Sequence, residues 1–164
     1  MRLGILGTLS LALMLISQVA LAETVRIGFV TTLTGGAGAI GNDMRDAVEL
    51  ALDHLGRKMG DSDVKMFYED DTFKPAVGKQ KTEKLVKKDK VHFVTGYIWS
   101  HVLMASRNSA VGKGPFMITS NAGPGAVAGK LCHEDFFSTS WQNDQTTMAM
   151  GEVLNQLGIK NLYI

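Results

Sequence analysis

The chain has 164 residues, of which 45% are hydrophobic, 20% charged and 7% aromatic. This ordinary composition excludes a disordered chain and a disulfide-dense miniprotein. Seventeen Lys and Arg residues nearly balance 16 Asp and Glu residues, which gives a formal charge of +1. Nucleic-acid-binding domains are usually strongly basic, so we expect no nucleic-acid partner.

The first 22 residues are typical of an export signal. Arg2 supplies a positive start, residues 9–16 form an apolar core, and Ala20-Leu21-Ala22 is a small-x-small cleavage site. A membrane anchor is the alternative, but glycines and polar residues leave only a short apolar centre. We therefore expect a periplasmic protein whose signal is cleaved after Ala22.

The rest of the chain alternates between apolar β-rich runs and segments with helical spacing of apolar residues. The predicted extended segments are Val25–Val30, Val64–Glu69, Val91–Thr95, Pro115–Thr119, Phe136–Ser140 and Asn161–Ile164. The predicted helices begin at Asn42 or earlier and end near Gly60, then run from Pro75 to about Lys88, from Trp99 or Ser100 to about Val111, and over Asp144–Leu157.

This alternation predicts an α/β fold with a mainly parallel sheet and helices on both faces. Residues 122–135 interrupt every periodicity with glycines and a proline, and mark the best candidate boundary. Since the sequence stops within a predicted strand, we expect a fragment that comprises one complete lobe and the start of a second.

Three loops follow predicted strands, where open α/β sheets bind their ligands. The first, residues 31–41, contains a G-x-G-x-x-G at Gly36, Gly38 and Gly41. Its distance from the preceding strand and from the next strand-end acid is too long for a dinucleotide site. The loop is then either a flexible connection between strand and helix or a glycine-rich lip that lets a small ligand approach the backbone.

The second loop contains Trp99 and Ser100, and the third contains Ser120 and Asn121. Ser100 is a plausible helix N-cap, whose N–H groups either accept a carboxylate or bind nothing. Trp99 either packs in the core or forms an aromatic wall, and the third loop is either a ligand contact or a plain turn.

The remaining chemical signals are weaker. The lysines of residues 79–90 are expected on a solvated helix face, and Glu69-Asp70-Asp71 are expected to cap a helix or face solvent rather than form a catalytic pair. The four histidines lack metal-ligand spacing, and no G-x-S-x-G is present. Cys132, the only cysteine, is expected to be a small apolar filler rather than a reactive thiol. We expect no enzyme, metal or cofactor.

The motifs occur in an order that resembles the solute-binding proteins of branched-chain-amino-acid-type ABC transporters, the type I periplasmic binding fold, and within it the members that bind aromatic acids. After the export signal, the matching segments are Val25-Arg26-Ile27-Gly28-Phe29-Val30, Leu33-Thr34-Gly35-Gly36, Glu69-Asp70-Asp71, Val91-His92-Phe93-Val94-Thr95-Gly96, Pro115-Phe116-Met117-Ile118-Thr119-Ser120 and Trp141-Gln142-Asn143-Asp144-Gln145.

The resemblance implies two lobes that close over a small carboxylate, a branched-chain amino acid or an aromatic acid, and deliver it to a membrane permease. Residues 23–131 would form the first lobe, 132–143 the hinge and 144–164 the start of a second lobe that is largely missing. The full-length protein would be a monomer. The implied ligand contacts, together with the loop residues above, are Ile40, Ile98, Trp99, Ser100, Ser120, Asn121, Ala122 and Gly123.

One position departs from the family pattern. Pro124 stands where members that bind amino acids usually have a Thr, and proline offers neither a hydroxyl nor an N–H. The departure favours an aromatic carboxylate, for which Trp99 could supply a wall. Two alternatives stay open: a periplasmic ligand-sensing domain of the same fold, and a dinucleotide-dependent enzyme.

Overall fold

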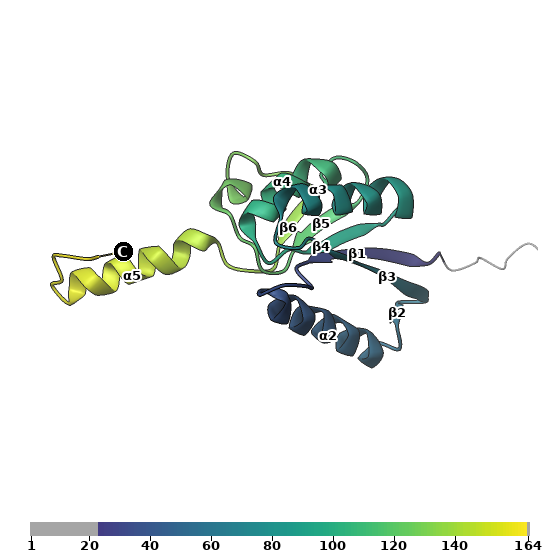
Figure 1. Ribbon diagram of the computed structural model, residues 1–164, viewed down its shortest axis with the longest axis horizontal. Coiled ribbons are helices and arrows are strands. Elements are labelled where there is room, and N and C mark those ends of the chain that lie inside the picture. Colours follow the sequence, from purple (N-terminus) through teal and green to yellow (C-terminus); the bar gives the residue numbers. More distant parts are fainter. Residues whose placement is uncertain (1–22, 164) are drawn as a thin grey trace, which may run out of the picture.

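A computed structural model describes residues 23–163 as one six-stranded sheet with helices on both faces (Figure 1). The strands are β1 (Val25–Thr31), β2 (Lys58–Met59), β3 (Ser62–Asp70), β4 (Phe93–Gly96), β5 (Phe116–Thr119) and β6 (Phe136–Ser138). The helices are α2 (Gly38–His54), α3 (Pro75–Lys84), α4 (Ser100–Ala110) and α5 (Asn143–Gln156), with a π-helical turn η1 (Leu85–Asp89) and a 3-10 turn η2 (Gly125–Ala128).

The sheet has the order β2-β3-β1-β4-β5-β6. All neighbouring strands run parallel except β2, which pairs antiparallel with β3. Parallel neighbours need crossover connections, and the helices supply these crossovers. The predicted α/β class with a mainly parallel sheet is confirmed.

One face of the sheet is covered by α3 and α4 (Figure 1). Val30, Val94 and Met117 point from the strands into this layer and are fully buried, as is Leu85 of η1. Gly28 of β1 leaves the space that Leu85 occupies, since a Cβ there would lie 2.7 Å from Leu85 Cδ1. This face therefore holds the hydrophobic core.

The opposite face carries α2 alone (Figure 1). A hydrogen bond from the Tyr68 hydroxyl to the Glu49 carboxylate ties α2 to β3. Beyond α2, Phe93, Phe116 and Phe137 form a row of rings across β4, β5 and β6, with centroids 6.0 Å apart at each step. Phe116 and Phe137 are 43% and 51% exposed, so this part of the sheet face is open.

Helix α5 extends away from the sheet, and none of its residues is buried (Figure 1). Its start is fixed by a capping box between Gln142 and Gln145. The Asn143 N–H donates to the Gly123 carbonyl, 2.7 Å away, and holds the beginning of the helix against the β5 loop.

The structure corrects several predicted boundaries. The first helix ends at His54 rather than near Gly60, because the left-handed residues Gly56 and Arg57 turn the chain into β2. The predicted extended segment Phe136–Ser140 is a strand only as far as Ser138. Residues 161–163 are not a strand, since no neighbouring strand accepts their hydrogen bonds among the described residues.

Two predicted side-chain environments are also wrong. Cys132 is exposed and does not fill an apolar space. Asp71 is fully buried and neither caps α3 nor faces solvent: α3 has no side-chain cap, and its first residue is Pro75. The predicted export signal, Met1–Ala22, lies outside the described residues.

Candidate functional site

The carboxyl ends of the parallel strands gather the candidate loops at one edge of the sheet. The loops after β1, β3, β4, β5 and β6 all lie there, as the parallel register requires. The start of α5 leaves the sheet from the same edge (Figure 1). This edge therefore joins the predicted site to the predicted hinge.

On the α2 side of this edge, Ile40, Ser120 and Asn121 line one hollow of about 370 Å³. The floor of the hollow is Phe29 and Thr95 from the sheet. Ile40 is 47% exposed and accessible to a ligand, whereas the Ser120 hydroxyl donates to the Gly96 carbonyl at 3.0 Å. The structure thus brings together three of the predicted contacts.

Ser100 is the first residue of α4, and the cap is Trp99, which makes no side-chain cap bond. The prediction that Ser100 caps the helix is wrong. Instead, Asn143 Nδ2 donates to Ser100 Oγ over 2.8 Å. Because the Ser100 oxygen accepts in this bond, the hydrogen of its hydroxyl group remains available to donate.

The side chains of Ile98 and Ala122 are buried, and a backbone group of each bonds to the neighbouring loop. The Ile98 carbonyl accepts from Asn121 Nδ2 at 3.1 Å, and the Ala122 N–H donates to the Tyr97 carbonyl at 3.0 Å. These bonds lock the β4 and β5 loops together. The N–H groups of Asn121 and Gly123 have no hydrogen-bond partner among the described residues, and Gly123 is buried.

Close packing also explains Gly123. A Cβ at this position would lie 1.9 Å from the Trp141 carbonyl oxygen, so only glycine lets the chain leading into α5 pass. The predicted contacts on the two loops, Ser100 and Gly123, are therefore linked through Asn143.

A buried carboxylate beneath the edge was not predicted. Asp71 Oδ1 accepts from Thr32 Oγ1 at 2.5 Å and from the Phe73 N–H at 2.8 Å. Thr32 Oγ1 in turn accepts from Trp99 Nε1 at 3.0 Å. Trp99 is half-buried and packs against the core, which is one of its two predicted roles; the other, an aromatic wall, stays a prediction.

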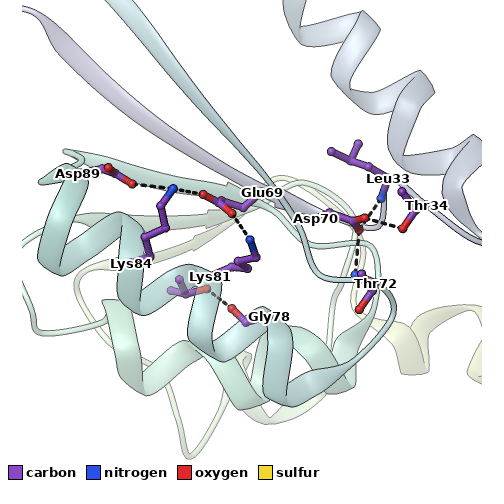
Figure 2. Close-up of polar contacts among 10 residues, drawn as sticks. Leu33, Thr34, Glu69, Asp70, Thr72, Gly78, Lys81, Lys84 and Asp89 are labelled. Atoms are coloured by element: carbon purple, nitrogen blue, oxygen red, sulfur yellow. Dashed lines mark hydrogen bonds and ion pairs between the residues drawn. The ribbon is translucent and has the colours of Figure 1, made fainter.

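The neighbouring acids, Asp70 and Glu69, bond to other parts of the fold. Asp70 accepts from the Leu33 N–H, the Thr34 hydroxyl and the Thr72 N–H, and so closes the first loop (Figure 2). Burial alone would raise the pKa of Asp70, but these hydrogen bonds outweigh it and hold the pKa below its ordinary value.

Glu69 points to the opposite side of the strand, toward α3 (Figure 2). Lys81 Nζ lies 2.8 Å from its carboxylate, and Lys84 contacts the other oxygen. Burial would raise the pKa of Glu69, but these donors lower it overall. Part of the predicted solvated lysine face is therefore paired with a buried acid.

Two glycines of the first loop, Gly38 and Gly41, allow close packing, whereas Gly35 and Gly36 border open space. A Cβ at Gly41 would lie 1.9 Å from the Thr32 carbonyl oxygen, and one at Gly38 would lie 2.8 Å from that of Leu33. Within residues 23–163, no group of His, Cys, Asp and Glu side chains has the arrangement of a metal site. No helix in this range has the length and apolar character needed to cross a bilayer.

Comparison with known proteins finds one matching family and several similar structures. The family model described as periplasmic binding protein matches residues 24–164. An ABC transporter substrate-binding protein from Sphaerobacter thermophilus is 30% identical, with a TM-score of 0.74. The alignment covers 83% of this chain and 38% of the Sphaerobacter protein. No curated protein matches the chain.

Two further solved structures carry ligands. A solute-binding protein of an ABC transporter from R. palustris, in complex with benzoate, is 26% identical over 84% of this chain and 38% of its own, with a TM-score of 0.78. The branched-chain amino acid transporter substrate-binding protein from Streptococcus pneumoniae, in complex with isoleucine, shares the fold at 22% identity over 83% of this chain and 39% of its own, with a TM-score of 0.72. The chain thus spans less than two fifths of these proteins.

Proposed function

Because the chain belongs to the periplasmic binding protein family, we propose that it forms the first lobe and hinge of an extracytoplasmic solute-binding protein. The protein captures a small carboxylate between two lobes and presents it to the permease of an ABC importer. Residues 23–131 form the lobe, 132–143 the hinge, and 144–164 begin the second lobe. The protein acts as a periplasmic monomer and uses no cofactor.

The donor pair at the carboxyl edge carries this proposal. Ser100 offers a hydroxyl hydrogen at the start of α4, and Gly123 offers an N–H on the adjacent loop. The positive end of the α4 dipole adds to the attraction for an anion. Asn143 donates to the Ser100 hydroxyl oxygen and to the Gly123 carbonyl, so closure of a second lobe and ligand binding would involve the same residues.

The ligand is a branched-chain amino acid or an aromatic acid. Ile40, Ser120 and Asn121 line the hollow on the α2 side of the same edge. Pro124 gives no N–H beside Gly123 for an amino-acid ligand, which favours an aromatic carboxylate.

The test is a titration of the protein with sodium benzoate and with isoleucine, in which binding is monitored through the NMR chemical shifts of the backbone amides. We expect shifts at residues 99–102 and at Gly123. The Ser100→Ala variant should bind about 1–3 kcal/mol more weakly, because a donor to a charged group is lost. Ser62→Ala, at the start of β3 and the opposite edge of the sheet, is the matched control. If Ser100→Ala binds with unchanged affinity, Ser100 does not contact the ligand. If neither benzoate nor isoleucine binds, the proposed function is overturned.

A further inference from the structure

We propose that Phe73, together with Trp99 and His101, forms a ring-binding wall that selects aromatic over aliphatic carboxylates, and that Asp71 is its positioning residue. This inference rests on the proposed function, since the wall lies beside the start of α4, where the carboxylate would bind.

The three rings form one cluster at the carboxyl edge of the sheet. The Phe73 ring stands edge-on to Trp99, with centroids 4.7 Å apart, and edge-on to His101 at 5.1 Å. Phe73 is nevertheless 48% exposed. His101 follows Ser100 directly in the first turn of α4, so the cluster adjoins the proposed carboxylate donor.

The backbone adopts an unfavourable conformation to place Phe73 there. Thr72 and Phe73 both have left-handed φ values, 50° and 62°, which non-glycine residues rarely adopt. The Thr72 N–H donates to Asp70 Oδ1 and the Phe73 N–H to Asp71 Oδ1, each at 2.8 Å. Two consecutive strained residues that present an exposed ring are more readily explained by ligand contact than by packing.

Asp71 fixes two sides of the cluster through one oxygen. Oδ1 holds the Phe73 backbone directly and the Trp99 indole through Thr32. The second oxygen, Oδ2, is buried and has no hydrogen-bond partner among the described residues. A buried polar atom without a partner costs stability, and the positioning of Phe73 and Trp99 would account for a carboxylate at this place.

A planar ring would bind this surface better than a branched aliphatic chain. Aromatic pairs gain from edge-to-face and offset-stacked contacts beyond the apolar area that they bury. A benzoate whose carboxylate lies at the start of α4 would bring its ring beside His101 and Phe73. An aliphatic side chain would gain only the burial.

The experiment compares the Phe73→Leu variant with wild-type protein, with benzoate and isoleucine as probes and NMR as the readout. Leu keeps an apolar side chain but removes the ring. We expect the benzoate Kd to rise about 2- to 12-fold, the range that corresponds to one lost aromatic contact, with the isoleucine Kd unchanged. Phe137→Leu, an equally exposed ring on the open sheet face, is the matched control and should change neither.

The Asp71→Asn variant tests positioning. We expect weaker benzoate binding and, in the unliganded protein, a shift of the Trp99 indole N–H signal. Trp99 and Trp141 are the only tryptophans of the chain, so the spectrum of Trp141→Phe identifies the Trp99 signal. An unchanged indole signal in Asp71→Asn would show that Asp71 does not position Trp99. Equal effects of Phe73→Leu on both probes, no effect on either, or binding of isoleucine without benzoate would overturn the wall and leave the proposed function intact. Binding of neither probe would instead reject the proposed function.

Discussion

The two faces of the sheet are built from the same strands but differ in how completely they are covered. Toward α3 and α4, Val94 and Met117 are fully buried. On the other face, alternate residues of these strands, such as Phe116, remain half-exposed beyond the edge of α2. The strands supply apolar side chains to both faces, so the difference comes from the helices. The core depends on the α3–α4 layer, and the α2 face is a weaker second layer.

Close contact between α3 and α4 is what makes the first layer dense. A Cβ at Gly78 would lie 2.4 Å from Val102 Cγ1, so the glycine lets the two helices approach. Both faces also have polar contacts with their helices: Glu69 joins β3 to α3, and Tyr68 joins β3 to α2.

The largest expected effect is on the covered face. Leu85→Ala should lower the free energy of unfolding by about 2–5 kcal/mol, because a fully buried side chain leaves a cavity beside Gly28. Urea unfolding measures the loss. The matched control is Leu50→Ala on the exposed side of α2, expected within about 0.5 kcal/mol of wild type. Similar losses in the two variants would contradict the contrast between the layers.

The polar tie of the covered face should have an intermediate effect and depend on pH. Glu69→Gln should cost about 1–3 kcal/mol at pH 7, because two lysines lose a buried carboxylate partner. The folded-state pKa of Glu69 is lowered, so its stabilisation is present above the unfolded pKa and is lost as pH falls through the folded pKa. The free energies of unfolding measured at pH 7 and at acidic pH should therefore differ less in Glu69→Gln than in wild-type protein.

Glu134→Gln provides the control for that measurement, because Glu134 is exposed and belongs to no ion pair among residues 23–163. If both variants kept the wild-type acid dependence, Glu69 would not be the group responsible.

The smallest expected effect belongs to the α2 face. Tyr68→Phe removes the hydroxyl that donates to Glu49 and should cost about 0.5–1.5 kcal/mol. Burial first, and the bond to Glu49 second, raise the pKa of Tyr68, so the hydroxyl stays protonated and this loss should not vary between pH 6 and about 9. Tyr163→Phe, at a 96% exposed position, should leave stability unchanged. A larger cost for Tyr68→Phe than for Glu69→Gln would reverse the ranking of the two faces.

Periodicity sufficed to predict most of the elements, because buried strands and amphipathic helices leave a direct trace in the chain. It failed where a local backbone conformation decides the outcome. The helix predicted to run to about Lys88 does so, but its last turn, Leu85–Asp89, is π-helical and closes at the left-handed residue Lys90. The apolar run 161–164 matched a strand in composition, but a strand also requires a partner, which composition does not encode.

The candidate site was predicted in part for the same reason. Strand ends with small residues indicated the loops that contain Ser100, Ser120 and Gly123, and the parallel register brings them to one edge. Phe73 was missed because its exposure depends on a left-handed backbone at a non-glycine residue. The available signal was the Asp70-Asp71 pair, since aspartates often accept from N–H groups two residues later.

The attachment of α5 has a mechanical consequence. Its 14 residues span about 21 Å, and the base of the helix is held at Gly123 while the remainder touches little. A rotation of about 10° at this base moves the far end by about 4 Å, given that length. Under the proposed function the helix begins the second lobe, so a small rotation beside Ser100 would produce a larger displacement within that lobe.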